Sequence, residues 1–290
     1  MDEWVEGWRI PLGTWVEGFV FWLQDMFPPF FNFLASVLTG IYEAMADLFT
    51  WPPVLVMIAI FGVLGLLARG WKFGIGGAVG LFGIQLLDQW ESSMQTLALV
   101  LGSVLIATVL AIPIGIVAAR SQVFSNLIRP VLDFMQTMPP LVYLLPGIFF
   151  FGIGEVPGML ATIVFAMPPG IRLTELGIRQ VDQEVVEAGH AFGSPPGKIL
   201  RQIQLPLARP TIMAGINQVI MLALSMVVLA GFVGAPGLGQ EVLSALSRIE
   251  IGLGAEAGLS VVILAIYLDR VTASLGTRSG LGLSRLVKMR

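Results

Sequence analysis

The chain has 290 residues, of which 56% are hydrophobic and only 12% carry a charge. A soluble domain carries about 25% charged residues, so this composition excludes an ordinary soluble protein and indicates a polytopic membrane protein. The net charge of −3 excludes a global basic surface for nucleic acid, and the absence of cysteine excludes disulfides and thiolate metal sites.

The first 52 residues are predicted to form an N-terminal scaffold at the membrane interface. All seven tryptophans lie within the first 90 residues, and tryptophan prefers the membrane–water interface. We therefore expect residues 14–49 to form amphipathic helices that lie in the interface. The alternative is one further membrane span over Phe30–Phe49, since about 20 residues are sufficient to cross a bilayer.

Seven membrane spans are expected after this region. Residues 53–90 would supply two peripheral transmembrane helices and residues 91–276 the core domain, followed by a cytoplasmic tail over 277–290. The segment 73–88 is short and rich in glycine. The seven expected spans are 53–69, 73–88, 94–119, 130–151, 156–171, 211–234 and 258–276.

Charge orients these spans. Basic residues gather in the connections after the first, third and fifth spans and after the last one, whereas the intervening connections are mainly acidic. The positive-inside rule makes the basic connections cytoplasmic. An odd number of spans with a cytoplasmic C-terminus then places the N-terminus outside, and this agrees with its five acids against Arg9 alone.

The stretch from Arg172 to Pro210 is the most polar part of the chain between two apolar segments, and it contains the only histidine, His190. A connection of this length is rarely without structure, and its pattern predicts two short helices. Asp182 is placed to cap the first helix. Its apolar face would consist of Val185, Ala188 and Phe192.

A second short helix is expected after Gly193, which breaks the first one. Ser194 would serve as its N-cap, followed by Pro195 at the first helical position. Leu205-Pro206 would end it. The two helices would form an elbow on the membrane surface with a narrow apolar face and a charged rim, a shape that suits a partner protein.

The elbow resembles a known motif. Glu187-Ala188-Gly189, then Gly193, then Ile203-Gln204-Leu205-Pro206 resemble the EAA loop of ABC importer permeases, with Gly189 in place of the second alanine. The resemblance to permeases of glycine betaine/proline importers extends over about Glu91–Thr272. It is carried by Asp133–Pro146, Phe151–Pro157, Ile171–Gly177, Pro210–Met226 and Gly237–Gln240.

The resemblance implies an all-α membrane protein with the fold of a type I ABC importer transmembrane domain. It implies a permease subunit of an ATP-driven, binding-protein-dependent importer of compatible solutes, such as glycine betaine, proline or choline, in a bacterial or archaeal inner membrane. The implied partners are a second permease chain (a homodimer), two ABC ATPase subunits and an extracytoplasmic solute-binding protein. ATP and magnesium would bind to the ATPase, and no cofactor is expected on this chain. The implied coupling residues are Glu187, Ala188, Gly189, Phe192, Gly193, Ile203, Leu205 and Pro206.

A translocation path is expected along spans that contain or adjoin prolines, because proline kinks a helix and kinked spans suit a gated path. Flexible, weakly polar side chains would line it, although ordinary helix packing is the alternative for each. The expected spans of the path contain no tryptophan, so a tight aromatic cage for a quaternary ammonium is not expected in them. The candidate path residues are Met135, Met138, Tyr143, Met221, Ser225 and Met226.

Other classes of function have little support. No cluster of His, Cys, Asp or Glu has the spacing of a metal site, and no glycine-rich stretch ends in the Gly-Lys-Ser/Thr of a Walker A loop. We therefore expect no catalytic site. Asp269 and Arg270 lie inside the last span, where an ion pair or a bond between helices is favoured over a proton relay. A stand-alone carrier or channel is the main rival hypothesis, and a membrane enzyme is the third.

Overall fold

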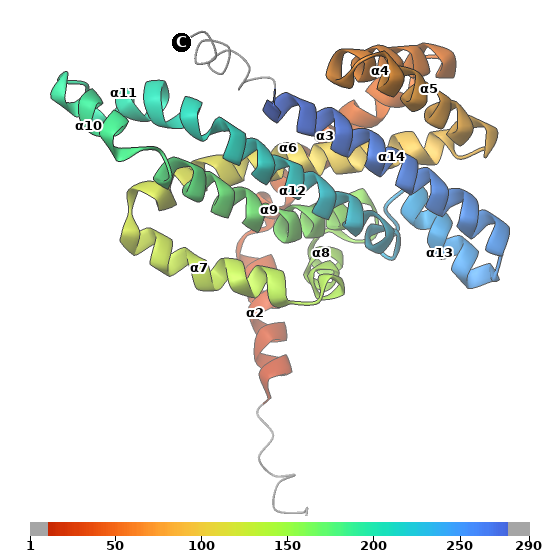
Figure 1. Ribbon diagram of the computed structural model, residues 1–290. Helices are drawn as coiled ribbons and strands as arrows, with labels where there is room; N and C mark the ends of the chain where they lie inside the picture. Colours follow the sequence, from red (N-terminus) through yellow and green to blue (C-terminus); the bar gives the residue numbers. More distant parts are fainter. Residues whose placement is uncertain (1–10, 278–290) are drawn as a thin grey trace, which may run out of the picture.

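The computed structural model describes residues 11–277, and within them the chain forms helices joined by short connections, with no β-strand (Figure 1). The expectations for the first ten residues and for the tail after Thr277 lie outside the described residues. In chain order the elements are α2 (Leu12–Met26), α3 (Pro28–Thr50), α4 (Val54–Arg69), α5 (Trp71–Leu86), α6 (Trp90–Arg120), α7 (Gln122–Thr137), the 3-10 helix η1 (Pro140–Tyr143), α8 (Leu144–Phe151), α9 (Glu155–Arg179), α10 (Gln183–Ala191), α11 (Pro196–Ile199), the π-helix η2 (Leu200–Gln204), α12 (Leu205–Gly231), α13 (Leu238–Arg248) and α14 (Ile251–Thr277).

Three long helices, α6, α9 and α12, form the centre of the bundle. α9 packs against both of the others, and Met159 and Val219 are fully buried in their shared core. Gly170 allows the close approach of the three helices. A Cβ atom at this position would lie 3.0 Å from Ala111 Cβ on α6 and 3.1 Å from Val219 Cγ2 on α12. Small residues at such crossings are typical of helices packed in a membrane.

α4 and α5 form a short hairpin beside α14. Tyr267 of α14 donates a hydrogen bond to the carbonyl of Phe61 at 2.6 Å, and its ring stacks on Phe73 with 5.8 Å between the centroids. Each helix of the hairpin has 16 residues, or about 24 Å, which is less than the hydrocarbon thickness of about 30 Å. The expected spans 53–69 and 73–88 are therefore helices, but shorter than a standard span.

Among the described residues, five helices are long and apolar enough to cross a membrane, and a bent pair raises the number to six. Seven spans are expected from the sequence. The difference arises because the helices of the hairpin are short, whereas α3 qualifies by length and composition. The five candidates are Pro28–Thr50, Trp90–Arg120, Glu155–Arg179, Pro196–Gly231 and Ile251–Ser274.

The segment expected to form one span over 130–151 is bent in the structure. α7 and the pair η1–α8 meet at an angle of 106°. Met138 stands between them in an extended conformation with ψ of 136°, because the proline that follows it disfavours the helical region. Pro139 is itself extended before Pro140, with ψ of 132°. Two consecutive prolines thus redirect the chain within an apolar stretch.

Residues 14–49 fall within two helices, as expected, and the second of them, α3, is continuous over 23 residues. Its first half lies beside the end of α8 and the start of α9. Phe31 stacks on Phe150 with 4.3 Å between the ring centroids, and Thr39 Oγ1 donates a hydrogen bond to Glu155 Oε1 at 3.4 Å. α2 has no buried residue and points away from the bundle, across the direction of the long helices (Figure 1).

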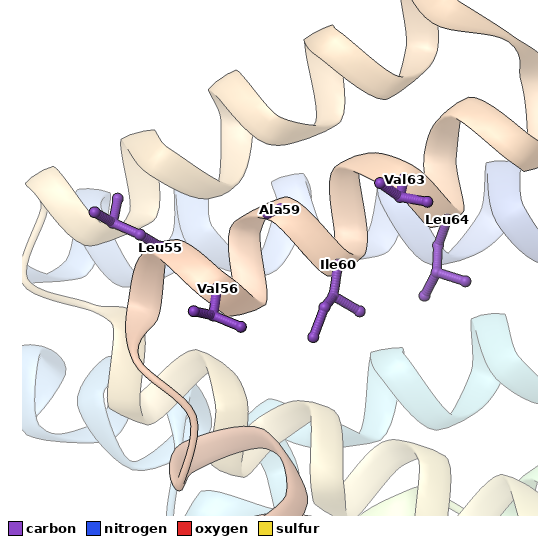
Figure 2. A pocket seen from close by; sticks show the side chains of 6 residues that line it. All are labelled: Leu55, Val56, Ala59, Ile60, Val63 and Leu64. Carbon is purple, nitrogen blue, oxygen red and sulfur yellow. The ribbon is translucent and has the colours of Figure 1, made fainter.

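One face of α4 carries a shallow groove lined only by apolar side chains (Figure 2). The cavity measures about 520 Å³ and opens widely to the surroundings. It has no aromatic ring or charge that could hold a quaternary ammonium, and its composition matches a surface that faces lipid. Its lining residues are Leu55, Val56, Ala59, Ile60, Val63 and Leu64.

Candidate functional site

The first helix of the elbow forms as the sequence predicts. Asp182 precedes α10 and its Oδ1 atom accepts a hydrogen bond from the backbone N–H of Glu184 at 2.9 Å, which satisfies a free donor of the first turn. The apolar face is turned outward. Val185 and Ala188 are exposed, and the side chain of Phe192 is 89% exposed. A large apolar side chain left so open marks a surface that a partner can cover.

Gly193 ends this helix in a left-handed conformation with φ of +73°. The N–H of Ser194 bonds to the carbonyl of Gly189 at 3.1 Å, and the N–H of Gly193 bonds to the carbonyl of His190 at 2.9 Å. This pair of bonds is the Schellman arrangement, which uses a residue with positive φ directly after the helix. The prediction that Gly193 breaks the helix is confirmed.

The second helix departs from the prediction at both ends. It begins at Pro196 with Pro195 before it, and the side chain of Ser194 forms no cap. Leu205-Pro206 does not end it. The N–H of Leu205 bonds to the carbonyl of Leu200, five residues back, in the π-helical turn, and Pro206 stands in the first turn of α12, where a missing N–H is tolerated. α11, η2 and α12 therefore form one continuous helical segment.

The residues of the motif fall into two groups. Glu187, Ala188, Phe192, Gly193 and Pro206 are exposed at the elbow surface, whereas Gly189, Ile203 and Leu205 pack between its parts. Gly189 is buried against the second helix, so that a Cβ atom there would lie 2.8 Å from Ile203 Cδ1. Ile203 and Leu205 pack against a small apolar cluster that joins the elbow to α9 and α12. The buried members of this cluster are Ile178, Val181, Leu200, Ala208 and Ile212.

A charged network lies directly beneath the elbow. The side chain of Glu175 is only 7% exposed, and its Oε1 atom accepts a hydrogen bond from Ser125 Oγ at 2.7 Å. The same oxygen lies 3.0 Å from Arg179 Nε and 3.4 Å from Arg129 Nη2. No role was predicted for Glu175 from the sequence, although its spacing of four residues from Arg179 is a signal for an ion pair on one helix face.

Three of the candidate path residues meet at the bend after α7. The hydroxyl of Tyr143 donates a hydrogen bond to the carbonyl of Met135 at 2.7 Å, and Met138 occupies the bend itself. Met135 and Tyr143 are both partly buried. The bend thus brings these residues together from two helices.

The other three path residues lie on α12 and differ in burial. Met221 and Ser225 are one turn apart and exposed, and the hydroxyl of Ser225 donates to the carbonyl of Met221 at 3.0 Å. Met226 is 1% exposed and packs with Leu144 and Ala161. This burial favours ordinary packing for Met226, whereas Met221 and Ser225 remain available to a path.

The remaining candidates are the pair Asp269 and Arg270 and a possible metal site. Asp269 of α14 accepts a hydrogen bond from Asn217 Nδ2 of α12 at 3.2 Å and lies 3.7 Å from Arg270 Nε, so the interpretation as a link between helices is confirmed. Within residues 11–277, no group of three or more His, Cys, Asp or Glu side chains is placed to hold a metal ion.

Comparison with known proteins agrees with these features. Residues 111–278 match the family model described as the binding-protein-dependent transport system inner membrane component. The chain is 47% identical over 267 residues to the glycine betaine transport system permease protein OpuAB of Bacillus subtilis, an alignment that covers 92% of this chain and 95% of that protein. It is 44% identical over 270 residues to the glycine betaine/proline betaine permease ProW of Escherichia coli, covering 93% and 76%.

A solved structure has the same fold. The MetNI methionine ABC transporter, in an inward-facing conformation, matches with a TM-score of 0.56 over 66% of this chain and 93% of that chain. Because the sequences are only 22% identical, this similarity supports the fold alone. The fold, the elbow and the close relatives agree, and this chain belongs to the family of inner membrane components of binding-protein-dependent transport systems.

Proposed function

We propose that this chain forms the membrane path of an ATP-driven importer for glycine betaine or a related compatible solute, and that its elbow couples the path to an ATPase. The relatives named above are permeases for glycine betaine, which supports the solute class. The observation that carries the coupling role is the exposed apolar face of α10, because Val185 and Ala188 are exposed and Phe192, directly after the helix, is 89% exposed.

The chemistry of α10 fits insertion into a cleft on another protein. A short helix gains affinity when it buries a narrow apolar face in a groove, and here that face consists of Val185, Ala188 and Phe192. Glu187 lies beside this face and is exposed, so it would meet a basic group and fix the register. ATP and magnesium would bind to the partner ATPase, which supplies the energy.

Replacement of Phe192 by alanine tests the coupling role. The side chain has almost no contact with the rest of the chain, so Phe192→Ala should leave the bundle folded and reduce co-purification of the ATPase at least about tenfold, since aromatic anchors at interfaces contribute 2 kcal/mol or more. Trp51→Ala is the matched control, because Trp51 is an aromatic residue that is 88% exposed outside the elbow. Equal recovery of the ATPase with both variants would remove the elbow's assigned role and favour a stand-alone carrier.

Solute selection is proposed to belong to an extracytoplasmic binding protein. The apolar groove on α4 has neither rings nor charge, and the predicted path residues form no aromatic cage among the described side chains. The purified permease should therefore show no tight binding of glycine betaine in titration calorimetry. A micromolar dissociation constant without the binding protein would place the selective site in this chain.

Two copies of the chain are proposed per transporter. Each chain has one elbow, so two ATPase subunits require two elbows. The exposed stripe with Met221 and Ser225 on α12 is available to line a path between two copies. Native mass spectrometry of the solubilised complex should give two identical permease chains, and two different permease chains or a single one would contradict this stoichiometry.

The N-terminus is proposed to lie outside and the elbow and C-terminus inside. The start of α3 contacts the end of α8 and the start of α9, through Phe31 with Phe150 and Thr39 with Glu155. Glu155 is the first residue of α9, whereas the elbow follows its last residue, Arg179, so this contact lies at the end of α9 opposite the elbow. Since the elbow end carries the basic residues, the positive-inside rule supports a cytoplasmic elbow and an external start of α3.

A further inference from the structure

A stripe of polar side chains joins α7 to α9. The contributing residues of α7 follow one another at intervals of three, four and four positions, so they share one helix face. They contact charged residues of α9 whose numbers fall as those of α7 rise, because the two helices run antiparallel. The contacts are Gln122 with Arg179, Ser125 with Glu175, Arg129 with Glu175, and Asp133 with Arg172.

Apolar packing of α7 is limited to one cluster, in which Leu132 is buried with Ala111 of α6 and Ile171 of α9. The outer face of the helix exposes Val123 and Leu127. The apolar cluster therefore joins α7 to both α6 and α9, whereas the polar stripe joins it to α9. The polar contacts thus favour α9 as the helix that α7 follows.

Glu175 forms the most buried of these contacts. The outermost contact joins Arg172 and Asp133, whose side chains are 39% and 65% exposed, and exposed pairs contribute little. Glu175 is 7% exposed, and a buried carboxylate requires its partners. Its single Oε1 atom is approached by one hydroxyl and two guanidinium groups, from Ser125, Arg129 and Arg179.

The position of this contact in the fold connects the elbow with the bend. Glu175 lies four residues before the end of α9, and Arg179, the last residue of α9, also donates to the carbonyl of Ala118 near the end of α6 at 2.8 Å. The connection to α10 begins directly after Arg179. At its other end α7 reaches Met138, where the chain turns by 106°.

We infer that Glu175 is a positioning residue that fastens α7 to the root of the elbow, so that displacement of the elbow is carried along α7 to the bend at Met138. This inference rests on the coupling function proposed above. Glu175 acts through Arg129 and Ser125 on α7 and through Arg179 on α9.

The test compares two carboxylates of the same helix pair in the complete transporter, reconstituted with its ATPase and binding protein. Glu175→Gln keeps the shape and the acceptor for Ser125 but removes the charge that holds two arginines. The ATPase should co-purify as in the wild type and hydrolyse ATP, while the solute imported per ATP falls about tenfold, the factor that 1.4 kcal/mol gives in an equilibrium. Asp133→Asn, at the exposed contact, should change this ratio less than about twofold.

Several outcomes would overturn the inference. A wild-type ratio of solute to ATP in Glu175→Gln would show that the contact transmits nothing. Loss of ATPase co-purification in the same variant would show that Glu175 shapes the docking surface instead. If Glu175→Gln does not fold, Ser125→Ala is used in its place, and it should also lower the amount of solute imported per ATP. Glu175→Asp retains the charge and should therefore restore part of the coupling. If the elbow had no role in coupling, the ATPase would co-purify with Phe192→Ala as it does with the wild type. This result distinguishes failure of the proposed function from failure of the inference about Glu175.

Discussion

Gly193 shows how a single backbone conformation shapes the elbow. Its φ of +73° allows the chain to turn from α10 into the second helix, and no heavy atom lies within 4 Å of the place where a Cβ would stand. Space is therefore not the restriction at this position. A residue with a side chain pays about 1–2 kcal/mol to adopt the left-handed conformation.

Replacement of Gly193 separates conformation from size. Gly193→Val should disturb the turn, because a β-branched residue is strongly disfavoured at positive φ, whereas Gly193→Asn should be close to the wild type, because asparagine tolerates this conformation. We expect binding-protein-stimulated ATP hydrolysis to fall in the valine variant only. The assay is hydrolysis in proteoliposomes. Equal losses in both variants would mean that the absence of a side chain, and not the backbone angle, is required.

At Gly189, helix propensity favours alanine, whereas the space beside Ile203 favours glycine. Alanine, the residue of the family pattern, would favour the helix by about 1 kcal/mol but would bring its Cβ to 2.8 Å from Ile203 Cδ1. Ile203→Val removes that methyl group. We therefore expect the double variant Gly189→Ala/Ile203→Val to have a higher thermal midpoint than either single variant. A midpoint below both would show that the two side chains do not share this space.

At the scale of elements, the sequence predicts regular helices well and redirected ones poorly. The cap at Asp182 and the break at Gly193 depend on residues within one turn, so local patterns reveal them. The continuation through Leu205-Pro206 depends on a π-helical turn, and no local pattern indicated it. The prolines at 139 and 140 predicted a kink after Met138, but nothing local indicated a bend as large as 106°.

The same reasoning applies to the site. The exposed residues of the elbow were predicted because a surface motif is contiguous in sequence. Glu175 was missed because its partners on α7 lie about 50 residues away, and only the folded chain brings Ser125 and Arg129 to it. Met226 was assigned to the path by its residue type, whereas its burial depends on how α8, α9 and α12 meet.

The N-terminal elements should differ in their contribution to stability. α2 has no buried residue, and the one ring contact that it forms with the bundle is that of Phe21 with Phe149 at 4.8 Å. Deletion of residues 1–26 should therefore change the thermal midpoint in detergent only slightly. Leu38→Ala in α3, where the side chain is 1% exposed, should cost about 2–5 kcal/mol. The reverse order of effects would mean that α2 supports the bundle.

At the scale of the whole molecule, the two ends differ in charge. Arg120, Lys198 and Arg201 line a cavity of about 500 Å³ beside the elbow, whereas Asp88, Glu91 and Glu241 line another of about 570 Å³. This asymmetry agrees with the proposed orientation, in which the elbow faces the cytoplasm.

The absence of cysteine permits a direct measurement of this orientation. A single cysteine at Ser36, in the exposed first half of α3, should react with a membrane-impermeant reagent added to intact cells. A cysteine at Ser194, in the elbow, should react only after the membrane is opened. Labelling of Ser194→Cys in intact cells, without labelling of Ser36→Cys, would reverse the assignment.

The continuous helical segment from Pro196 to Gly231 has a mechanical consequence. Its 36 residues correspond to about 54 Å. The segment packs closely on α9 at more than one level, because a Cβ at Gly215 would lie 3.0 Å from Leu173 Cβ and a Cβ at Gly177 of α9 would lie 3.0 Å from Thr211 Cβ. These contacts are spread along the segment and do not form a single pivot, so a force on its elbow end is expected to shift α12 and α9 together.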